Sequence, residues 1–287
     1  MPELQKKSHS SMITKITEKV VISKMDNGSI ILTKDELAIE EPLEIKLSYS
    51  TANGQMQKNI SVTMRTPGND EELAAGFLFT EGIIKNEAEV LKINHVLSDS
   101  NSVLVNLVEN VMPSLNNAER NFYTTSSCGI CGKASIDAIS VSAVYANTKD
   151  TILIPASLVY SLPELVKNEQ KIFQNTGGIH ASALFSLTGE LQLVREDVGR
   201  HNALDKIIGN RFLNKELPLD YNILFLSGRT SFELVQKAFM AGIKIIVAVG
   251  APSSLALDMA KECGITLIGF LRGEKFNIYT GAQRISL

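Results

Sequence analysis

The sequence has no tryptophan and only three cysteines among its 287 residues, and both shortages narrow the class of protein. So few cysteines exclude the disulfide scaffold of a small secreted domain. No stretch reaches about eighteen uninterrupted apolar residues, the minimum for a helix that crosses a membrane. Residues 1–18 mix lysine, histidine, serine and glutamate, and they match neither a signal peptide nor a membrane anchor. We expect a disordered tail at 1–18, a cytoplasmic protein and no contact with a membrane.

The chain also lacks an excess of basic residues. It has 28 Lys and Arg against 31 Asp and Glu, a formal net charge of −3 and a pI near 5.9. A protein that binds nucleic acid through the phosphate backbone usually shows a basic face or stripe, so we expect no nucleic-acid partner. Hydrophobic residues make up 44% of the chain, which is ample for a buried core.

The sequence of the first half of the chain predicts antiparallel β-structure. Strands between residues 20 and 62 are separated by the turn signals at 26–28 and 52–54. Acidic residues then open a helix that covers 73–79 and ends at Gly82, and further strands are expected near His95 and at 103–108. We expect a smaller β-rich subdomain at 19–121.

The second half alternates between helices and strands. Its order predicts a larger domain at 122–287 that opens with a cysteine-containing loop. Because strand–helix–strand crossovers join parallel strands, we expect an α/β domain with a mainly parallel sheet, in an α+β chain overall. The expected elements are a helix at 136–144, a helix at 158–173, a hairpin at 179–195, helices at 202–208, 232–241 and 255–262, and strands at 222–226, 244–249 and 266–270.

A pair of cysteines three residues apart is the strongest chemical signal. Hydroxyl residues precede Cys128 and an apolar periodic stretch follows Cys131, which favours a helix N-terminus or the loop that enters it. Free backbone N–H groups there lower a thiol pKa from about 8.5 into the range of about 3.5–7.5 and so favour the nucleophilic thiolate. Gly129 and Gly132 leave the sulfurs accessible, and Lys133 adds a nearby positive charge. The pair is therefore suited to carrying sulfur.

Two other uses of such a pair stay open. A C-x-x-C motif can hold structural zinc, but a second pair of ligands at metal-binding spacing is missing from the sequence. It can also serve in thioredoxin-like redox chemistry, although no strand leads clearly into the motif here. Cys263 lies among apolar neighbours and is expected in the core. We expect no metal ion held by the protein.

Three loops in the second half suggest a site for an anionic ligand. The carboxyl ends of parallel strands meet at one edge of the sheet, where open α/β folds bind ligands. Small and hydroxyl residues at helix N-termini there can bind phosphate, although such residues are more often ordinary helix caps. A guanine-nucleotide enzyme without thiol chemistry is therefore a third possibility. The residues expected to hold the ligand are Ser227, Gly228, Arg229, Gly250 and the loop Phe270, Leu271, Arg272, Gly273, Glu274 and Lys275.

A charge-rich segment at 195–202 adds further candidates. The simpler interpretation is a solvated turn capped by Asp197. The functional interpretation is that Arg200 and His201 lie on a ligand phosphate or beside the thiol. Gly178 lies just before His180, at a place where glycine permits close backbone approach. His180 is either a ligand contact or a half-buried histidine.

At these residues the sequence resembles the formate dehydrogenase accessory sulfurtransferase family. The blocks that carry the resemblance follow one another across nearly the whole chain, and they lie at 64–79, 127–134, 177–180, 195–206, 227–234, 249–254 and 270–273.

The resemblance implies a sulfur carrier. It would take persulfide sulfur from a cysteine desulfurase and pass it to a molybdenum or tungsten bis(guanine dinucleotide) pterin cofactor, before that cofactor enters formate dehydrogenase. Cys128 then bears the persulfide, Cys131 assists, and the 270–275 segment contacts the guanine dinucleotide. The cofactor is an acceptor and not permanently bound. The alternative is a redox or zinc-binding chaperone of the immature client.

The resemblance also implies a homodimer and a cytidine-deaminase-like, three-layer fold for the larger domain. Deaminase chemistry itself is not expected. Zinc deaminases need an H-x-E element ahead of P-C-x-x-C, whereas here Ala181 and Ser182 follow His180, the cysteine pair comes first, and Ser127 takes the place of the proline.

Overall fold

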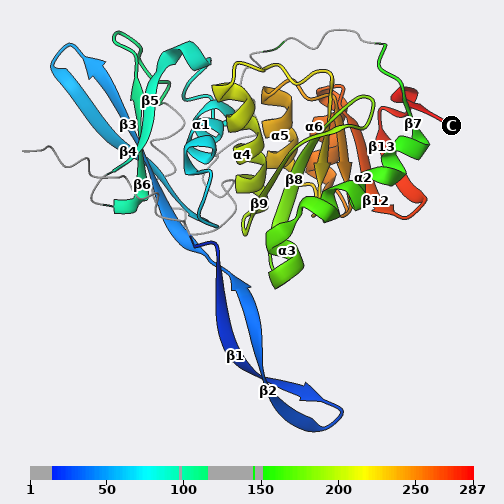
Figure 1. The fold of residues 1–287 in the computed structure, drawn as a ribbon. Helices are drawn as coiled ribbons and strands as arrows, with labels where there is room; N and C mark the ends of the chain where they lie inside the picture. Colours follow the sequence, from blue (N-terminus) through cyan, green and yellow to red (C-terminus); the bar gives the residue numbers. More distant parts are fainter. Residues whose placement is uncertain (1–14, 97–98, 116–144, 146–150) are drawn as a thin grey trace, which may run out of the picture.

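The computed structural model describes residues 15–96, 99–115, 145 and 151–287. A four-stranded sheet with a protruding hairpin forms one side of the molecule, and a six-stranded sheet flanked by helices forms the other (Figure 1). Cys128, Cys131 and the helix expected at 136–144 lie outside the described residues. No helix within the described ranges is both long and apolar enough to cross a membrane.

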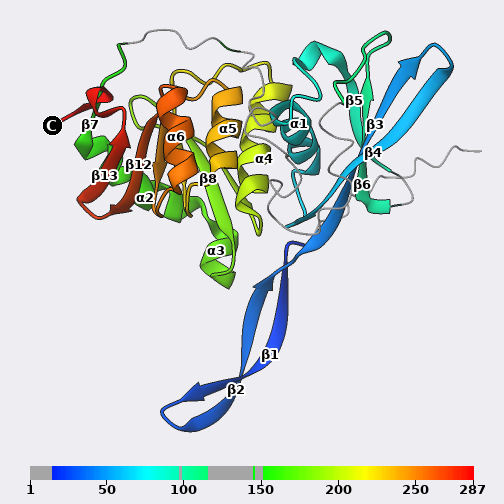
Figure 2. The ribbon, with the colours of Figure 1, turned by 180° about the vertical axis from the view of Figure 1, so that it is seen from behind.

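The protruding hairpin consists of β1 (Thr17–Asp26) and β2 (Ser29–Ala38), which pair along their whole length. Asn27 and Gly28 both have positive φ, at 46° and 83°, as a tight two-residue hairpin turn requires. The turn predicted at 26–28 is confirmed. Figures 1 and 2 show this hairpin extending well away from the rest of the molecule.

The four-stranded sheet has the order β4-β3-β6-β5, in which β3 and β6 are parallel and the other pairs antiparallel. The predicted turn at 52–54 joins β3 and β4. The alternating apolar side chains of β3 are all buried, as their period of two requires. The strand bounds are β3 (Glu41–Thr51), β4 (Gly54–Arg65), β5 (Val90–Val96), which follows a 3-10 turn at Glu87–Glu89, and β6 (Asp99–Leu107).

Helix α1 (Asp70–Thr80) joins the two halves of the molecule by packing directly against α4 (Arg200–Leu213). Gly76 of α1 and Gly209 of α4 make the contact close: a Cβ on Gly76 would lie 1.9 Å from the backbone oxygen of Asp205. Apolar residues from both halves belong to one buried cluster. The β-rich part and the larger part therefore share a core.

The six-stranded sheet has the order β13-β12-β11-β10-β8-β9. Only β10–β11 and β11–β12 pair in parallel, whereas the other three pairs are antiparallel. The prediction of a mainly parallel sheet is therefore wrong, because a hairpin forms each end of the sheet. The bounds are β8 (His180–Ser186), β9 (Leu191–Asp197), β10 (Asn222–Leu226), β11 (Ile245–Ala248), β12 (Thr266–Arg272) and β13 (Lys275–Thr280).

Helices cover both faces of this sheet, which gives three layers (Figure 2). Helices α4, α5 (Phe232–Met240) and α6 (Ser254–Glu262) pack on one face, and α2 (Ala156–Glu169) packs on the other. The single helix predicted at 158–173 is interrupted at Gln170, and α3 (Lys171–Thr176) follows. The remaining short elements are β7 (Ile154–Pro155), β14 (Ile285–Ser286) and a 3-10 turn at Ala282–Arg284.

Candidate functional site

The loops that follow β10 and β11 are joined at the carboxyl edge of the parallel strands. The backbone N–H of Gly250 donates to the carbonyl of Gly228 at 3.1 Å, and the N–H of Thr230 donates to Ala251 at 3.1 Å. A Cβ on Gly250 would lie 2.7 Å from the Gly228 oxygen, so only glycine permits this approach. The structure thus brings together two of the three loops expected to form the site.

The third predicted segment is a hairpin and not a loop, but it lies beside the other two loops as predicted. Residues 270–275 form the end of β12, a tight turn and the start of β13, since glycine at 273 supplies the positive φ of a short hairpin. The N–H of Phe270 donates to the Gly250 carbonyl at 3.2 Å, which ties this hairpin to the other loops. Arg272, Glu274 and Lys275 are exposed, whereas the side chain of Leu271 is buried in the core.

Phe270 sits at a bulge in β12 and has a φ of 55°. A bulky residue in the left-handed region is strained, and such strain is concentrated at functional sites because packing elsewhere must maintain it. Its ring is 41% exposed, so the strain does not serve burial of the side chain. The geometry marks Phe270 as a candidate contact for a ligand.

His180 lies against the first of these loops. A Cβ on Gly228 would lie 3.2 Å from Nδ1 of the His180 ring, and the Ser227 hydroxyl oxygen accepts a hydrogen bond from the N–H of Ala181 at 2.8 Å. Ser227 therefore ties its loop to β8. Burial, helped by the charges of Arg200 and Arg229, lowers the pKa of His180, against the opposing effect of Asp197.

The charge-rich segment at 195–202 divides into a structural part and a part that faces the site. Asp197 is fully buried, pairs with Lys206 at 2.7 Å and accepts the N–H of Gly199. Arg195 pairs with Glu72 through two hydrogen bonds of 2.6 and 2.8 Å. These side chains hold β9, α1 and α4 together. The interpretation as a solvated turn capped by Asp197 is therefore wrong, since Asp197 is buried and Gly199 occupies the N-cap of α4 without a side-chain cap.

Arg200 and His201 begin α4 and lie beside the joined loops. Nε2 of His201 lies 3.0 Å from the hydroxyl of Ser231 and 3.1 Å from the carboxylate of Glu233. Burial, together with the charges of Arg200, Lys237 and His180, lowers the pKa of His201 to about 3. The imidazole is therefore neutral at physiological pH.

Two buried polar atoms at this edge have no hydrogen-bond partner within the described part of the chain, Nε of Arg200 and the hydroxyl oxygen of Thr230. Buried donors of this kind are costly when left unpaired. Arg229 is exposed beside them. Two guanidinium groups next to neutral histidines and an unpaired hydroxyl fit an anionic ligand better than a cation.

A cavity of about 460 Å³ opens next to His180 and Ser227. Its walls include Lys167, Gln170 and Phe173 from the corner between α2 and α3, none of which sequence reasoning selected. No local motif marks these three residues, because the cavity depends on how α2 and α3 pack over the sheet. The break at Gln170, where the predicted helix was expected to continue, is the nearest signal.

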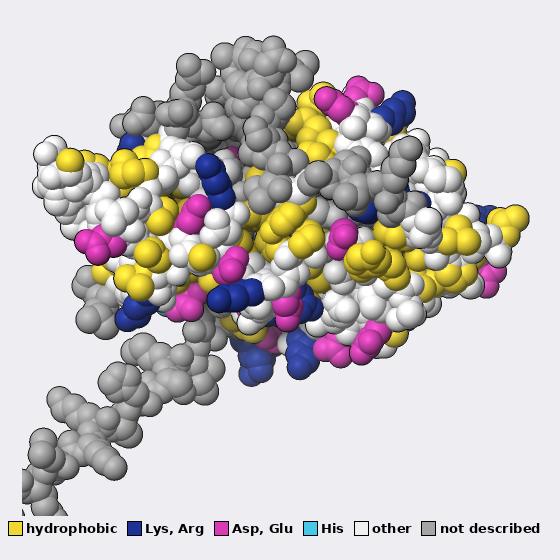
Figure 3. Space-filling view, turned by 90° about the horizontal axis from the view of Figure 1, so that it is seen from above, with side chains coloured by type: hydrophobic (Ala, Val, Ile, Leu, Met, Phe, Trp, Pro, Cys, Tyr) yellow, Lys and Arg dark blue, Asp and Glu magenta, His cyan; other side chains and the backbone are white. Residues whose placement is uncertain are grey.

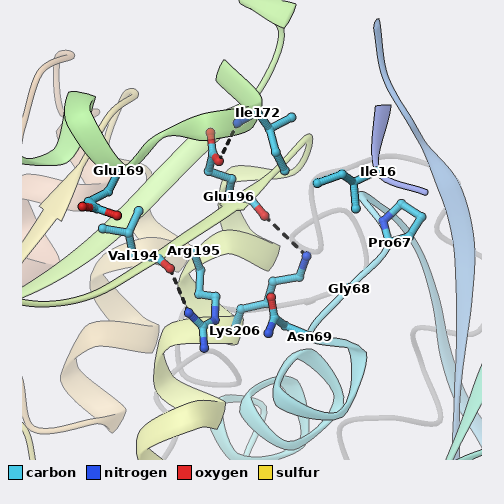
Figure 4. Close-up of a pocket in the computed structure, with 10 residues that line it drawn as sticks. All are labelled: Ile16, Pro67, Gly68, Asn69, Glu169, Ile172, Val194, Arg195, Glu196 and Lys206. Carbon is cyan, nitrogen blue, oxygen red and sulfur yellow. Dashed lines mark hydrogen bonds between the residues drawn. The ribbon is translucent and has the colours of Figure 1, made fainter. Parts of the chain in front are cut away.

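A second, smaller cavity of about 200 Å³ lies at the junction between β9, α4 and the turn before α1 (Figure 4). Figure 4 shows Lys206 directed toward the Glu196 carbonyl and the Glu196 carboxylate directed toward the backbone N–H of Ile172. Since Lys206 is already paired with Asp197, it is not a free cation for a ligand. We assign this cavity to the packing between the two halves.

Charge on the rest of the surface is mixed. On the face in Figure 3, lysine and arginine side chains lie among acidic and apolar ones and do not gather into a stripe. Among the described residues, no group of three or more His, Cys, Asp or Glu side chains could hold a metal ion. A zinc site that used Cys128 and Cys131 would lie outside those residues.

The lowered pKa of His201 gives a pH prediction. Since the folded pKa is about 3 and the unfolded value is about 6.5, the unfolded state binds more protons between these values. The stability that this histidine contributes is complete above about pH 6.5 and falls as the pH drops toward 3. Urea unfolding from pH 7 to pH 4 should therefore show a steeper loss of stability for the native sequence than for His201→Gln.

NMR spectroscopy should detect the lowered pKa of His201 directly. The ring resonances of His201 in NMR spectra are expected to stay unchanged from pH 8 to pH 5, and the His201→Gln spectrum identifies them. A titration of His201 with a midpoint near 6.5 would contradict the buried, neutral state.

The comparisons with known proteins point to one family and cover most of the chain. Residues 38–286 match the model of the FdhD/NarQ family. The chain is 46% identical to the "Sulfur carrier protein FdhD" of Streptomyces coelicolor, over 95% of this chain and 97% of that one. It is 44% identical to the protein of the same name from Sulfolobus acidocaldarius, over 94% and 98% of the two chains.

A solved structure also matches. The crystal structure of a protein described as a formate dehydrogenase accessory protein, from Desulfotalea psychrophila, superposes with a TM-score of 0.71 at 25% identity. The match covers 95% of this chain and all of the other. The resemblance stated from the sequence and the mixed α/β fold are thereby confirmed, whereas the cytidine-deaminase-like detail stays a prediction.

Proposed function

Because the chain belongs to the FdhD/NarQ family, we propose that it carries sulfur from a cysteine desulfurase to the molybdenum or tungsten bis(guanine dinucleotide) pterin cofactor of formate dehydrogenase. The observation that carries the proposal is the family match over 38–286, a range that contains Cys128 and Cys131. Relatives named sulfur carrier proteins, from bacteria and from archaea, match almost end to end. In this proposal the chain acts as a sulfurtransferase.

The first chemical step is an exchange between thiolate and persulfide. The thiolate of Cys128 attacks the terminal sulfur of the donor persulfide, the old sulfur–sulfur bond breaks, and the donor leaves as a thiolate. Cys128 then carries the sulfur as its own persulfide. Cys131 assists by holding or exchanging the same sulfur atom.

The second requirement is a place for the acceptor. The cofactor is a substrate with several phosphate groups, and phosphate is bound best by guanidinium forks and free N–H or O–H donors. Arg200, Arg229 and the unpaired hydroxyl of Thr230 lie at the joined loops and supply such groups. In this proposal, Phe270 and the exposed hairpin turn after it contact the nucleotide part.

The partners follow from the same chemistry. The donor would be a cysteine desulfurase, since that enzyme forms a protein persulfide. The client would be formate dehydrogenase, as the description of the Desulfotalea psychrophila protein indicates. We also propose a homodimer, which sedimentation of the purified chain would test.

Sulfur loading of Cys128 tests the proposal most directly. The purified chain is incubated with a cysteine desulfurase and free cysteine, and its intact mass is measured. We expect a gain of one sulfur atom that disappears on addition of a reductant. The gain should be absent from Cys128→Ala, whereas Cys128→Ser serves as a matched oxygen control.

Two results would oppose this function. If Cys128→Ala gains sulfur as the native chain does, Cys128 is not the carrier. If the native chain instead contains about one zinc ion per chain that Cys128→Ala loses, the zinc-binding chaperone is the better reading.

A further inference from the structure

The hairpin of β1 and β2 presents an apolar face to solvent. Directly opposite residues of an antiparallel pair lie on the same face, and the register places Met25 opposite Ile30 and Ser23 opposite Leu32. Val21, two residues before Ser23, lies on that face as well, because side chains alternate along a strand. The exposed fractions are 69% for Val21, 66% for Met25, 69% for Ile30 and 73% for Leu32. We call these four side chains the arm face.

The arm face needs a partner, because the hairpin is attached to the body at its base. Within the described residues, β2 contacts α3, and Ile16, just before β1, lines the small cavity together with Ile172 of α3. Beyond this base the hairpin extends away from the rest of the molecule (Figures 1 and 2). An isolated two-stranded hairpin is marginally stable at best in water. Packing of the arm face against another surface would supply the missing stability.

The composition of the hairpin favours a partner that is apolar and carries little net charge. Residues 17–38 contain four acidic and three basic side chains, so the hairpin has no excess positive charge for a nucleic acid or an anionic lipid surface. Insertion of its tip into a bilayer would bury Asp26 and Asn27, which is costly. A second copy of the chain, in contrast, meets a nearly neutral hairpin without strong repulsion.

A second exposed apolar patch lies where the hairpin leaves the body. The edge strand β4 exposes 61% of Val62 and 47% of Met64, and the register places Met64 opposite Pro42, which is also exposed. These side chains lie on the face turned away from the core, since the alternate residues of β3 are buried. The strand ends at Arg65, which pairs with Glu41, three residues after β2 ends. We call Pro42, Val62 and Met64 the root patch.

The area available for contact decides how two copies would meet. Ten residue pairs at about 3.4 Å per residue, on strands about 4.8 Å apart, give the hairpin a face of about 340 Å². Two hairpins packed face to face would bury about 700 Å² in total, less than the roughly 1,200 Å² at which stable interfaces begin. If each hairpin instead lies on the body of the other copy, the buried area doubles to about 1,400 Å². A stable dimer therefore requires the exchange of both hairpins.

We propose that the hairpin is an exchanged dimer arm: the arm face of each copy packs on the root patch of the other copy, around a two-fold axis. This inference rests on the homodimer of the proposed function and specifies its interface. A two-fold interface must be self-complementary, and one chain carries both the arm face and the root patch. All of the hairpin except its last residue precedes the range 38–286 that matches the family model, so that match assigns it no role.

Sedimentation of the full-length chain over a range of concentrations tests the arm. We expect the native chain to be a dimer and Leu32→Lys to raise its dissociation constant at least about 100-fold, because a two-fold interface contains each substitution twice. Leu91→Lys is the matched control, since Leu91 is a leucine of similar exposure, 71%, on the edge strand β5 and outside both patches. Its dimer should persist, and both variants should keep the native circular dichroism spectrum.

A mixing experiment tests which surface receives the arm. Val62→Glu should weaken the dimer as Leu32→Lys does, since it places a charge beneath the arm of the other copy. In a mixture of the two variants, one arm–root contact is native and the other brings opposite charges together. The mixture should therefore form heterodimers at concentrations at which each variant alone is monomeric.

The inference is overturned if the native chain is a monomer, if Leu32→Lys dimerises as the native chain does, or if the mixture forms no heterodimer. Binding of the native chain to phosphatidylcholine–phosphatidylglycerol vesicles that Leu32→Lys loses would assign the arm face to a lipid surface and would also overturn it. The mass gain at Cys128 is read separately. A normal gain together with an unaltered Leu32→Lys dimer rejects the arm alone, whereas a missing gain in a native dimer rejects the sulfur carrier alone.

Discussion

Replacing Cys128 with alanine is expected to reduce sulfur-dependent activation of formate dehydrogenase to background. Removing a covalent nucleophile lowers the rate on the order of 10⁶-fold in a well-studied hydrolase, and in the proposed function Cys131 only assists after Cys128 has accepted the sulfur. The measurement is the activity of the client enzyme after maturation with desulfurase, free cysteine and the variant chain.

Two controls make this result specific. The Cys128→Ala chain should keep the circular dichroism spectrum and melting temperature of the native chain, since a fold defect would also abolish activation. Cys263→Ala should activate the client normally, because Cys263 is buried and burial raises the pKa of its thiol to about 11. Full activation of the client by Cys128→Ala would end the proposal.

The arrangement of the site suggests why a sulfur carrier needs so little catalytic machinery. A persulfide already contains an activated sulfur, so transfer depends mainly on bringing donor and acceptor together. Neutral His180 and His201 beside Arg200 and Arg229 give a positive edge for a polyanionic acceptor. In the proposed function, holding the acceptor would therefore be the main task of the described residues.

Local signals in the sequence predicted local structure well. The turns at 26–28, 52–54 and 188–189 were predicted because glycine or asparagine there permits positive φ. The pairing of strands was predicted less well, because a hydrophobic period does not state which strand lies beside which. The hairpin of β8 and β9 was predicted, whereas β13 at the other edge of the large sheet and the antiparallel pairing of β8 with β10 were missed.

The sequence did not indicate which charged side chains are buried. Lys206 and Lys237 are almost fully buried and pair with Asp197 and Asp205, yet such residues are normally expected on the surface. Their partners come from other elements, and only the fold shows that each pair is buried. Lys237 also donates to Thr80 of α1, which shows how the two halves are joined.

In the candidate site, too, some features were predicted from the sequence and others were missed. The meeting of the loops after β10 and β11 was predicted and is confirmed, because it follows from the direction of parallel strands. The hairpin at 270–275 was missed, since no strand pattern was recognised beyond it. The break at Gln170 was missed because it depends on how α2 and α3 pack over the sheet and not on a motif in the chain.

Replacing Gly209 with alanine is expected to destabilise the fold by at least about 4 kcal/mol, the range in which single substitutions are exceptional. A Cβ there would lie 1.8 Å from the backbone oxygen of Glu72 and 2.7 Å from the N of Gly76. Both atoms are backbone, so no side chain can move aside, and α1 must shift away from α4. Interiors are packed too tightly to absorb such a shift cheaply.

Whether Gly209→Ala raises or lowers the free energy of unfolding distinguishes the effect of helix packing from that of helix propensity. In an isolated helix, alanine is favoured over glycine by about 0.5–1 kcal/mol, so a stabilised Gly209→Ala chain would contradict the close helix contact. Gly178→Ala is the matched control and should change the free energy of unfolding by less than about 0.5 kcal/mol, since its Cβ would meet only the Thr176 backbone oxygen, at an ordinary contact distance of 3.8 Å. Urea unfolding measures both. Because α4 begins with Arg200 and His201, a shift of this helix should also displace both side chains, so the ring resonances of His201 in NMR spectra of any folded Gly209→Ala chain should differ from those of the native chain.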